Sequence, residues 1–256
     1  MYLSIDIGGT KTLIALFSRR GRVLRRKKFR TAQGYRTFVS DLTENISSFK
    51  RFKIKAVVVA VPGVVQKNYS VSFGNRKWAD IDLITPIKSV FDCPVYFEND
   101  ANLATLFESY RLPGKTVFLT FSTGIGGGIA EKNRILPESS RMEPGHVKYS
   151  YNGKTMEWED IAAASAIENA YHVEWATNLR GQVIMKDIAA RIALGLPDII
   201  NQYSPDRIIL GGPMGKIFKL YSKYLPELGV KYQRPKRPNE SVIYGCYLYA
   251  KQKERE

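Results

Sequence analysis

The sequence is poor in cysteine, and the two cysteines it has are far apart. Cys93 and Cys246 stand in none of the spacings that bind metals or form redox pairs. A small secreted domain held together by disulfides needs several such pairs. We therefore expect both residues to be small buried side chains of a protein from a reducing compartment.

Long apolar runs are also missing. No stretch reaches the roughly 18 residues that a membrane helix needs. The first residues carry an acid at position 6 and lack the basic stretch of a secretory signal. No short repeat or low-complexity segment is present. These absences predict a soluble cytoplasmic protein that does not associate with membranes.

Acidic residues are outnumbered, with 24 against 39 basic residues and a net charge of +15. Such an excess suits either a nucleic acid or an anionic substrate. The densest basic run, residues 19–30, is interleaved with Val23, Leu24 and Phe29, as in a solvated hairpin. We favour a solvated surface over a nucleic-acid groove, and we expect no nucleic-acid partner.

The first half of the chain predicts a meander followed by alternating strands and helices. Strands over 2–7, 11–17 and 23–31 are separated by short turns. Apolar spacing then predicts the following elements: a helix over 37–52, a buried strand over 56–61, a loop that includes 74–78, a helix over 83–91, a strand over 94–97 and a helix over 101–110.

Leu112-Pro113-Gly114 marks a boundary, after which a similar pattern begins again. The second half predicts a strand over 117–121, a glycine-rich turn over 124–128, a strand from 129, helices over 157–171 and 177–203, a strand over 207–210, a helix over 216–225, a basic loop over 233–238 and a closing helix over 241–250. We expect two α/β lobes, 1–112 and 113–240, around a cleft.

Two glycine-rich turns open the two halves. In Asp6-Ile7-Gly8-Gly9-Thr10-Lys11-Thr12 the glycines allow a tight turn and close approach to a ligand. Amides in such a turn can bind an anion, and Asp6 could hold magnesium through water. A plain hairpin turn explains the motif equally well. Ser122-Thr123-Gly124-Ile125-Gly126-Gly127-Gly128 is the matching turn, and the pair suggests a polyphosphate held from both sides.

Asn99-Asp100 lies between a predicted strand and a predicted helix. Either residue caps a helix well. The alternative is a carboxylate at the carboxyl end of a strand, where α/β sheets place ligands. Both interpretations stay open on this motif alone.

Three further motifs carry candidate ligand contacts. Glu143-Pro144-Gly145-His146 places a carboxylate and an imidazole where they could bridge neighbouring hydroxyls of a sugar. Gly211-Gly212 after a buried strand could accept an adenine or simply lead into a helix. Glu157, Glu159 and Asp160 open a predicted helix, a position that favours acids in any case.

Taken together, five motifs resemble the ROK family of sugar kinases and repressors in their order and rough spacing. They are Asp6-Ile7-Gly8-Gly9-Thr10-Lys11, Glu98-Asn99-Asp100-Ala101-Asn102, Thr123-Gly124-Ile125-Gly126-Gly127-Gly128, Glu143-Pro144-Gly145-His146 and Leu210-Gly211-Gly212. The resemblance covers nearly the whole chain. It implies the actin-like ATPase fold of the hexokinase type, with the C-terminal helix, about 241–256, packing back onto the first lobe.

The resemblance also implies roles for individual residues. Asp100 is expected to be the general base. The hexose is expected to contact Asn99, Glu143, His146, Glu159 and Gly63. ATP is expected to contact Asp6, Gly8, Gly9, Thr10, Lys11, Thr123, Gly124, Gly126, Gly211 and Gly212, with Mg²⁺ held by Asp6, through water.

The chain departs from the family after His146. Many members continue with Cys-x-Cys-Gly-x-x-Gly-Cys-x-Glu, a zinc loop in which the histidine is also a ligand. Counting back from Glu159, the cysteine positions fall on Ser150, Asn152 and Glu157. Serine and asparagine are poor zinc ligands beside thiolates, so we expect no zinc. We also expect none of the N-terminal DNA-binding domain that the family's repressors carry.

We therefore expect an ATP-dependent kinase that phosphorylates a hexose hydroxyl, O6 of glucose or of a related hexose. Three alternatives remain open: a catalytically idle sugar sensor, a kinase that uses polyphosphate as donor, and a nucleic-acid-associated protein that uses its basic surface. Neither the particular hexose nor the oligomeric state follows from the sequence, although homodimers are common in the family.

Overall fold

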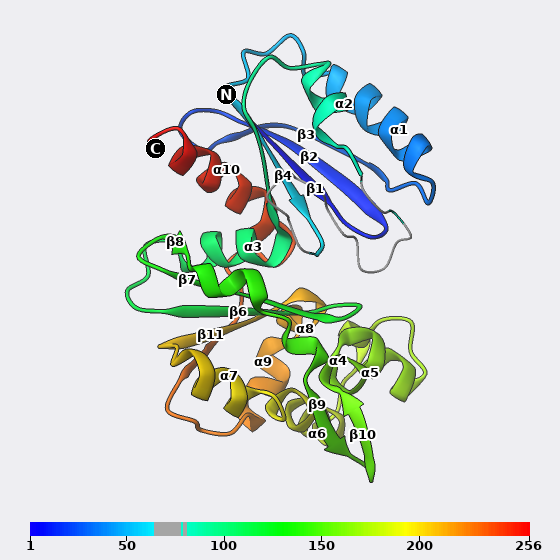
Figure 1. Ribbon diagram of the computed structural model, residues 1–256. Coiled ribbons are helices and arrows are strands. Elements are labelled where there is room, and N and C mark those ends of the chain that lie inside the picture. The colour runs from blue at the N-terminus through cyan, green and yellow to red at the C-terminus, as the bar shows by residue number, and fades with distance from the viewer. Residues whose placement is uncertain (64–77, 79–80) are drawn as a thin grey trace. The chain divides into compact units, whose positions relative to one another are not determined.

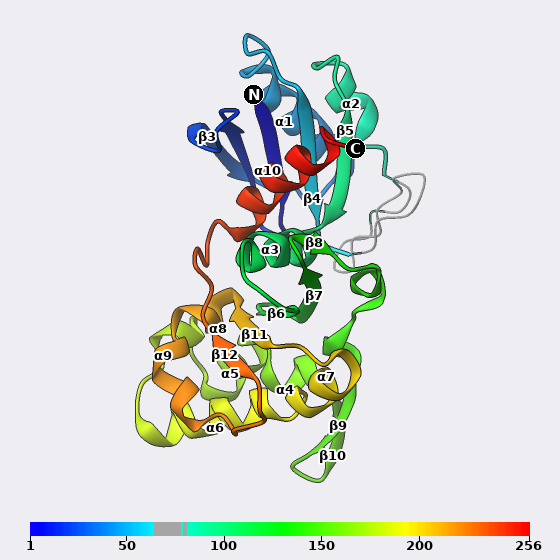
Figure 2. The same ribbon diagram turned by 90° about the vertical axis from the view of Figure 1, so that its left-hand side faces the viewer.

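The computed structural model describes residues 1–63, 78 and 81–256. The chain forms two compact units, one of Met1–Phe107 with Val242–Glu256 and one of Glu108–Ser241. Each unit has its own five-stranded sheet with helices packed on it (Figures 1 and 2). The loop expected over 74–78 lies outside the described residues except for the buried Trp78.

The sheet of the first unit has the order β3-β2-β1-β4-β5. Strands β1 (Tyr2–Ile7), β2 (Lys11–Phe17) and β3 (Val23–Arg30) form the predicted antiparallel meander. Strands β4 (Ala56–Val61) and β5 (Val95–Asn99) continue the sheet in parallel with β1. The carboxyl ends of β1, β4 and β5 therefore meet at one edge of the sheet.

Helices cover both faces of this sheet (Figures 1 and 2). Helices α1 (Tyr35–Ser47) and α2 (Ile84–Lys88) pack on one face through a core that includes Phe38, Leu42 and Ile87. On the other face, Leu103 of α3 (Asp100–Ser109) and Ile243 of α10 (Ser241–Lys253) share a second core. This double coverage explains why all six residues of β4 are buried.

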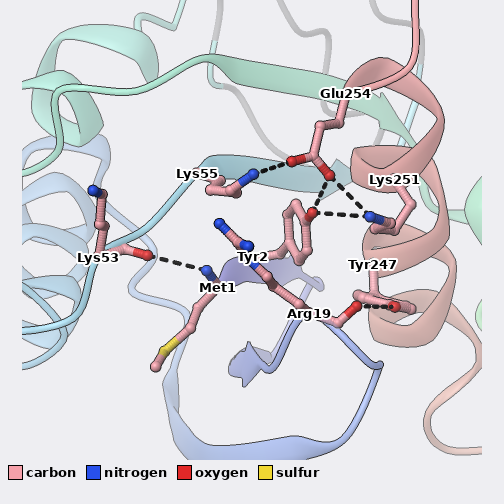
Figure 3. A network of polar contacts seen from close by, with 8 residues as sticks. All are labelled: Met1, Tyr2, Arg19, Lys53, Lys55, Tyr247, Lys251 and Glu254. Atoms are coloured by element: carbon pink, nitrogen blue, oxygen red, sulfur yellow. Dashed lines mark hydrogen bonds and ion pairs between the residues drawn. The ribbon is translucent and has the colours of Figure 1, made fainter.

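The end of the chain is fastened to its beginning. Glu254 accepts hydrogen bonds from the Tyr2 hydroxyl and from the amines of Lys55 and Lys251 (Figure 3). These bonds hold the pKa of Glu254 well below its usual range. On the same side, the Tyr247 hydroxyl donates to the Arg19 carbonyl oxygen at 3.1 Å. Helix α10 thus belongs to the first unit, as the resemblance implies.

The second unit is built on a sheet of order β12-β11-β6-β7-β8. Its strands are β6 (Thr116–Phe121), β7 (Ile125–Glu131), β8 (Arg134–Ile135), β11 (Arg207–Gly211) and β12 (Lys231–Gln233). The expected glycine-rich turn over 124–128 is wrong in extent. The turn ends at Gly124, and residues 126–128 pair with β6 inside β7. Glycines are tolerated there because the strand pairs through its backbone.

The remaining elements of the second unit surround a core centred on Trp158. A separate hairpin of β9 (Lys148–Tyr151) and β10 (Lys154–Glu157) was not predicted. The helical and 3₁₀ segments are α4 (Trp158–Ala162), α5 (Ala164–Tyr171), α6 (Gln182–Ala193), α7 (Leu196–Tyr203), α8 (Gly212–Lys216), α9 (Phe218–Tyr221), η1 (Pro137–Arg141), η2 (Pro144–His146), η3 (Ala176–Asn178) and η4 (Ser222–Tyr224).

The two long helices expected over 157–171 and 177–203 are each interrupted. Ala163 is extended between α4 and α5. Helix α6 begins only after Gly181, which has a φ of 102°, and Gly195 with Pro197 separates α6 from α7. Proline at a helix start stops the preceding helix from continuing. In the described parts of the chain, no helix is long and apolar enough to cross a membrane.

Candidate active site

The first unit gathers two carboxylates at the carboxyl edge of its sheet. Asp6 lies near the end of β1, opposite Ala60 of β4, and Asp100 follows β5 directly. Burial and the negative charge of Asp100 raise the pKa of Asp6 to about 7, although the charge of Lys11 opposes the rise. A nearby cation would stabilise the ionised form of such a carboxyl group and so lower its pKa.

The turn after β1 is braced by a threonine from the end of β3. The Gly8 amide donates to the Lys11 carbonyl oxygen at 3.1 Å, so this donor is used inside the turn. The Thr31 hydroxyl donates to the Gly8 carbonyl oxygen at 2.9 Å, and the Thr31 amide donates to the Thr10 carbonyl oxygen at 3.0 Å. Gly9, Thr10 and Lys11 are exposed. A phosphate at this turn would be met by these three residues rather than by the amide of Gly8.

Asn99, not Asp100, makes the capping bond of α3. Its Oδ1 accepts a hydrogen bond from the Asn102 amide at 3.1 Å, three residues on, as a helix cap does. Its Nδ2 donates to the Gly63 carbonyl oxygen at 3.0 Å, which ties the ends of β4 and β5 together. Oδ1 of Asp100 accepts from the next amide, that of Ala101, at 2.7 Å. The capping interpretation is therefore met by Asn99, which stands directly before Asp100.

Glu98 is part of the motif but received no role from the sequence. Its Oε1 accepts from the Asn99 amide at 2.8 Å and from Nδ2 of Asn102 at 2.9 Å. Burial raises the pKa of Glu98, and these two hydrogen bonds oppose the rise. Glu98 thus fixes both asparagines that flank Asp100. In the sequence, only the place of Glu98 in the Asn-rich motif, directly before Asn99, pointed to this role.

In the second unit, the turn between β6 and β7 is held by the start of α5. The Ser165 hydroxyl donates to the Thr123 carbonyl oxygen at 2.7 Å, and the Ser165 amide donates to the Ser122 carbonyl oxygen at 3.2 Å. The turn closes on itself through the Ser122 amide, which donates to the Gly124 carbonyl oxygen at 2.9 Å. Thr123 is exposed at its tip.

Glu159 enters this turn because two glycines make room for its carboxylate. Its Oε2 accepts from the Ile125 amide at 3.2 Å. A Cβ atom at Gly124 would lie 2.5 Å from that oxygen, and a Cβ atom at Gly145 would lie 2.6 Å from it. Gly124 therefore has a role beside Glu159 in addition to the expected phosphate role.

His146 is the centre of an acidic cluster. Its Nδ1 lies 2.9 Å from Oε2 of Glu157 and 3.9 Å from Oε1 of Glu159. The hydrogen bond with Glu157 raises the pKa of His146, and the charges of Glu159, Glu157 and Glu143 add to this effect. The structure thus brings His146 and Glu159 together with Glu157, for which the sequence suggested a helix start and a lost cysteine position but no contact with His146. Glu143 is exposed two residues before Gly145.

His146, Glu157 and Glu159 each offer one ligand atom within 4.8 Å of the others. A structural zinc site has four protein ligands, usually with thiolates among them. This cluster offers three ligand atoms instead of four, and none of them is sulfur. Gly211 and Gly212, expected beside the adenine, lie at the end of the fully buried β11 and at the start of α8.

Comparison with known sequences identifies the class of protein to which this fold and these motifs belong. The chain belongs to the ROK family, whose pattern matches residues 2–246. Structural comparison shows the actin-like ATPase fold. A ROK family glucokinase from Streptomyces griseus, solved with glucose and AMPPNP, has a TM-score of 0.78 and 20% identity, over 98% of this chain and 99% of that one.

Sequence relatives within the family differ in what they do. A fructokinase from Lactococcus lactis subsp. cremoris is 26% identical over 230 residues, which are 82% of this chain and 78% of the relative. A xylose repressor from Bacillus spizizenii is 29% identical over 178 residues, which are 59% of this chain and 46% of the relative. Sugar recognition recurs in these names, but the individual sugar does not.

Proposed function

We propose that the protein is an ATP-dependent hexose kinase, which transfers the γ-phosphoryl group of ATP to a hexose hydroxyl, O6 of glucose or of a related hexose. The observation that carries the proposal is the division of work between Asn99 and Asp100. Asn99 makes the cap bond of α3, and the carboxylate next to it stands directly after β5 at the carboxyl edge of the sheet, where α/β sheets place ligands. Membership of a family that contains fructokinases and glucokinases supports the same reaction.

In this mechanism the first unit supplies the base. Asp100 accepts the proton of the attacking sugar hydroxyl as the bond to phosphorus forms. Glu98 and Asn99 hold the backbone on either side of it, and the contact between Asn99 and Gly63 keeps β4 and β5 in place. Asn99 and Gly63 also contribute hydrogen-bonding groups to the hexose.

Magnesium is the cation that the reaction requires, and Asp6 is the residue that fits it. Burial, and after it the charge of Asp100, raises the pKa of Asp6, and a divalent cation would relieve the repulsion between the two carboxylates. We propose that Asp6 holds Mg²⁺ through water, while the exposed Gly9, Thr10 and Lys11 face the phosphates and Gly8 shapes the turn that carries them. When bound, magnesium neutralises charge on the phosphate groups.

The second unit supplies the remaining contacts. We assign Glu143, His146 and Glu159 to the sugar hydroxyls, because a carboxylate accepts and an imidazole can either donate or accept a hydrogen bond. The exposed Thr123, with Gly124 and Gly126, faces the phosphates, and Gly211 with Gly212 faces the adenine. Within this scheme the chain works without zinc and needs neither nucleic acid nor membrane, and a homodimer is the assembly to test first.

A coupled assay of ADP release tests this proposal. Glucose, mannose, fructose, N-acetylglucosamine and N-acetylmannosamine would each be supplied with ATP and magnesium, beside a control without sugar. We expect at least one hexose to stimulate ADP release well above that control. Binding of a sugar by calorimetry without any stimulation would instead identify a sensor, the alternative that the family's repressors represent.

One observation favours polyphosphate as a second candidate donor. The register of β2 and β3 places Arg30 beside Lys11 of the phosphate turn, with Lys28 and Arg26 following on the same face of β3. Alternate residues on a strand lie about 7 Å apart, so these side chains form a row of cations leading away from the turn. Replacing ATP by long-chain polyphosphate in the same assay measures this alternative. Arg26→Ala with Lys28→Ala should then weaken polyphosphate use and spare ATP use.

A further inference from the structure

The segment between His146 and Trp158 is closed by a short hairpin. Strands β9 and β10 pair from Lys148 opposite Glu157 to Tyr151 opposite Lys154. Asn152 and Gly153 form the two-residue turn, with φ angles of 50° and 74°. Two positive φ angles in an Asn-Gly pair are typical of the type I′ turn, which suits the twist of a hairpin. Backbone hydrogen bonds of the two strands thus close this segment.

A buried tryptophan anchors the base of the hairpin. Trp158 follows β10 directly, is fully buried, and its Nε1 donates to the Arg191 carbonyl oxygen at 3.1 Å. Its backbone amide donates to the Val147 carbonyl oxygen at 2.8 Å, which joins the residue before β9 to the residue after β10. The backbone that carries Glu157 is therefore fixed from the core outward.

This anchoring sets Glu157 against His146. The 2.9 Å contact joins Oε2 of Glu157 to Nδ1 of the imidazole. An ionised carboxylate can only accept, so Nδ1 carries the hydrogen. The other ring nitrogen, Nε2, is left as the atom that can meet a ligand. The groups facing the ring are Glu157, Glu159 and Glu143, all acids.

We propose that Glu157 is a positioning residue for His146: the hairpin holds this carboxylate against Nδ1 and so sets the direction of Nε2. This inference deepens the proposed function and rests on it, because the value of an oriented imidazole is its contact with the hexose. Glu157 itself does not touch the sugar. Its effect passes through His146.

Kinetics of three variants test this role. Glu157→Ala should raise the KM for the hexose about tenfold, since an unoriented ring loses its directed hydrogen bond, and should leave the KM for ATP within about twofold. Glu157→Gln keeps an oxygen that accepts from Nδ1 and should restore most of the affinity. Thr155→Ala, exposed on the same strand, is the matched control and should match the parent.

A double-mutant cycle separates positioning from a structural role. In the background of His146→Ala, adding Glu157→Ala should change the hexose KM by less than about twofold, because the group that Glu157 orients is already gone. Equal losses in both backgrounds would overturn the proposal, and so would a Glu157→Ala protein that loses affinity for hexose and ATP alike.

A second readout needs no activity at all. The chain has two histidines, so the ¹⁵N spectrum of its imidazoles contains two sets of signals, and His172→Asn assigns them. His172 has a φ of 52°, which asparagine adopts readily. At about pH 9, where an ordinary imidazole is neutral, His146 should be protonated at Nδ1. Glu157→Ala should move the proton largely to Nε2.

The two readouts keep the two ideas apart. A fixed Nδ1–H in a protein that phosphorylates no hexose would reject the proposed function while the orientation stands. An Nδ1–H signal unchanged by Glu157→Ala would overturn the positioning role whatever the kinetics show. Zinc chloride added at one equivalent should leave the His146 signals in place. Stoichiometric zinc binding there that lowers the hexose KM would also overturn the proposal.

Discussion

The two units place their candidate residues by different means. In the first unit, Asp6, Asn99 and Asp100 lie where parallel strands end, so strand register and a helix cap fix them. In the second unit, His146 and Glu159 come from a 3₁₀ turn and the start of a five-residue helix, and side-chain contacts fix them. Positions fixed by strand register and a helix cap should tolerate substitution better than positions fixed by single side-chain contacts.

The units also differ in charge. The first has 21 basic and 10 acidic residues, and the second has 18 and 14. No acid occurs between Ile7 and Ser40, a segment that contains the Gly8-Gly9 turn and all of β3. The second unit instead gathers acids around His146. On the proposed function, the first unit suits an anionic donor and the second a neutral, hydroxyl-rich acceptor.

The largest effect should come from Asp100→Asn in the first unit. Because Asn99 makes the cap, this change should leave the melting temperature within about 1 °C. Loss of the general base should lower kcat by about 10² or more. The matched change Asn99→Ala should instead affect stability, because it removes the cap and should lower the free energy of unfolding by about 1 kcal/mol. Turnover of Asp100→Asn within a few-fold of the parent, with sugar binding intact, would remove Asp100 from the base role.

A smaller effect is expected from Gly124→Ala in the second unit. The new methyl group would lie on the Glu159 carboxylate and push it from the Ile125 amide, so the hexose KM should rise about tenfold. Gly9→Ala is the comparison in the first unit, since a Cβ atom there meets nothing within 4 Å. Steady-state kinetics of the two variants, with thermal melts to check folding, test this prediction. A Gly124→Ala protein with a raised KM for ATP and an unchanged KM for the hexose would contradict this account of the turn.

The smallest effect is on stability, through Asp6. The folded protein holds the Asp6 proton up to about pH 7, while the unfolded chain releases it near 3.8. The ionised form therefore opposes folding, and this contribution to stability is lost as pH rises from 3.8 toward 7. Asp6→Asn should raise the free energy of unfolding at pH 8 by about 1 kcal/mol or more, and by less at pH 5. Urea unfolding at both pH values checks this, and a variant less stable than the parent at pH 8 would refute the linkage.

Much of the first unit could be predicted from the sequence. Strands β1, β2 and β4 appeared with their observed bounds, because alternation and buried runs are strong local signals. The roles of Asn99 and Asp100 could not be separated, since both residue types cap helices and only the 3.1 Å bond to Asn102 decides between them.

The second unit was harder to predict for a physical reason. The extended residue Ala163 leaves no trace in the apolar period, and Gly195 lies so close to Trp158 that a Cβ atom there would be 2.6 Å from the ring, a tertiary contact that the period does not record either. The β9–β10 hairpin is marked only by Asn152-Gly153, and the contact of Glu157 with His146 depends on that hairpin. Gly126 shows the opposite error, because a glycine run that resembled a turn proved to be strand.

The central claim is that the chain transfers a phosphoryl group from ATP to a hexose hydroxyl, and ³¹P NMR of the reaction mixture tests it most directly. Protein, ATP, magnesium and the hexose that best stimulates ADP release would be followed to completion. We predict a sugar phosphomonoester signal that grows in step with ADP, with coupling to the C6 protons that places the phosphate on O6. Inorganic phosphate growing in step with ADP, with no phosphomonoester signal, would contradict the claim.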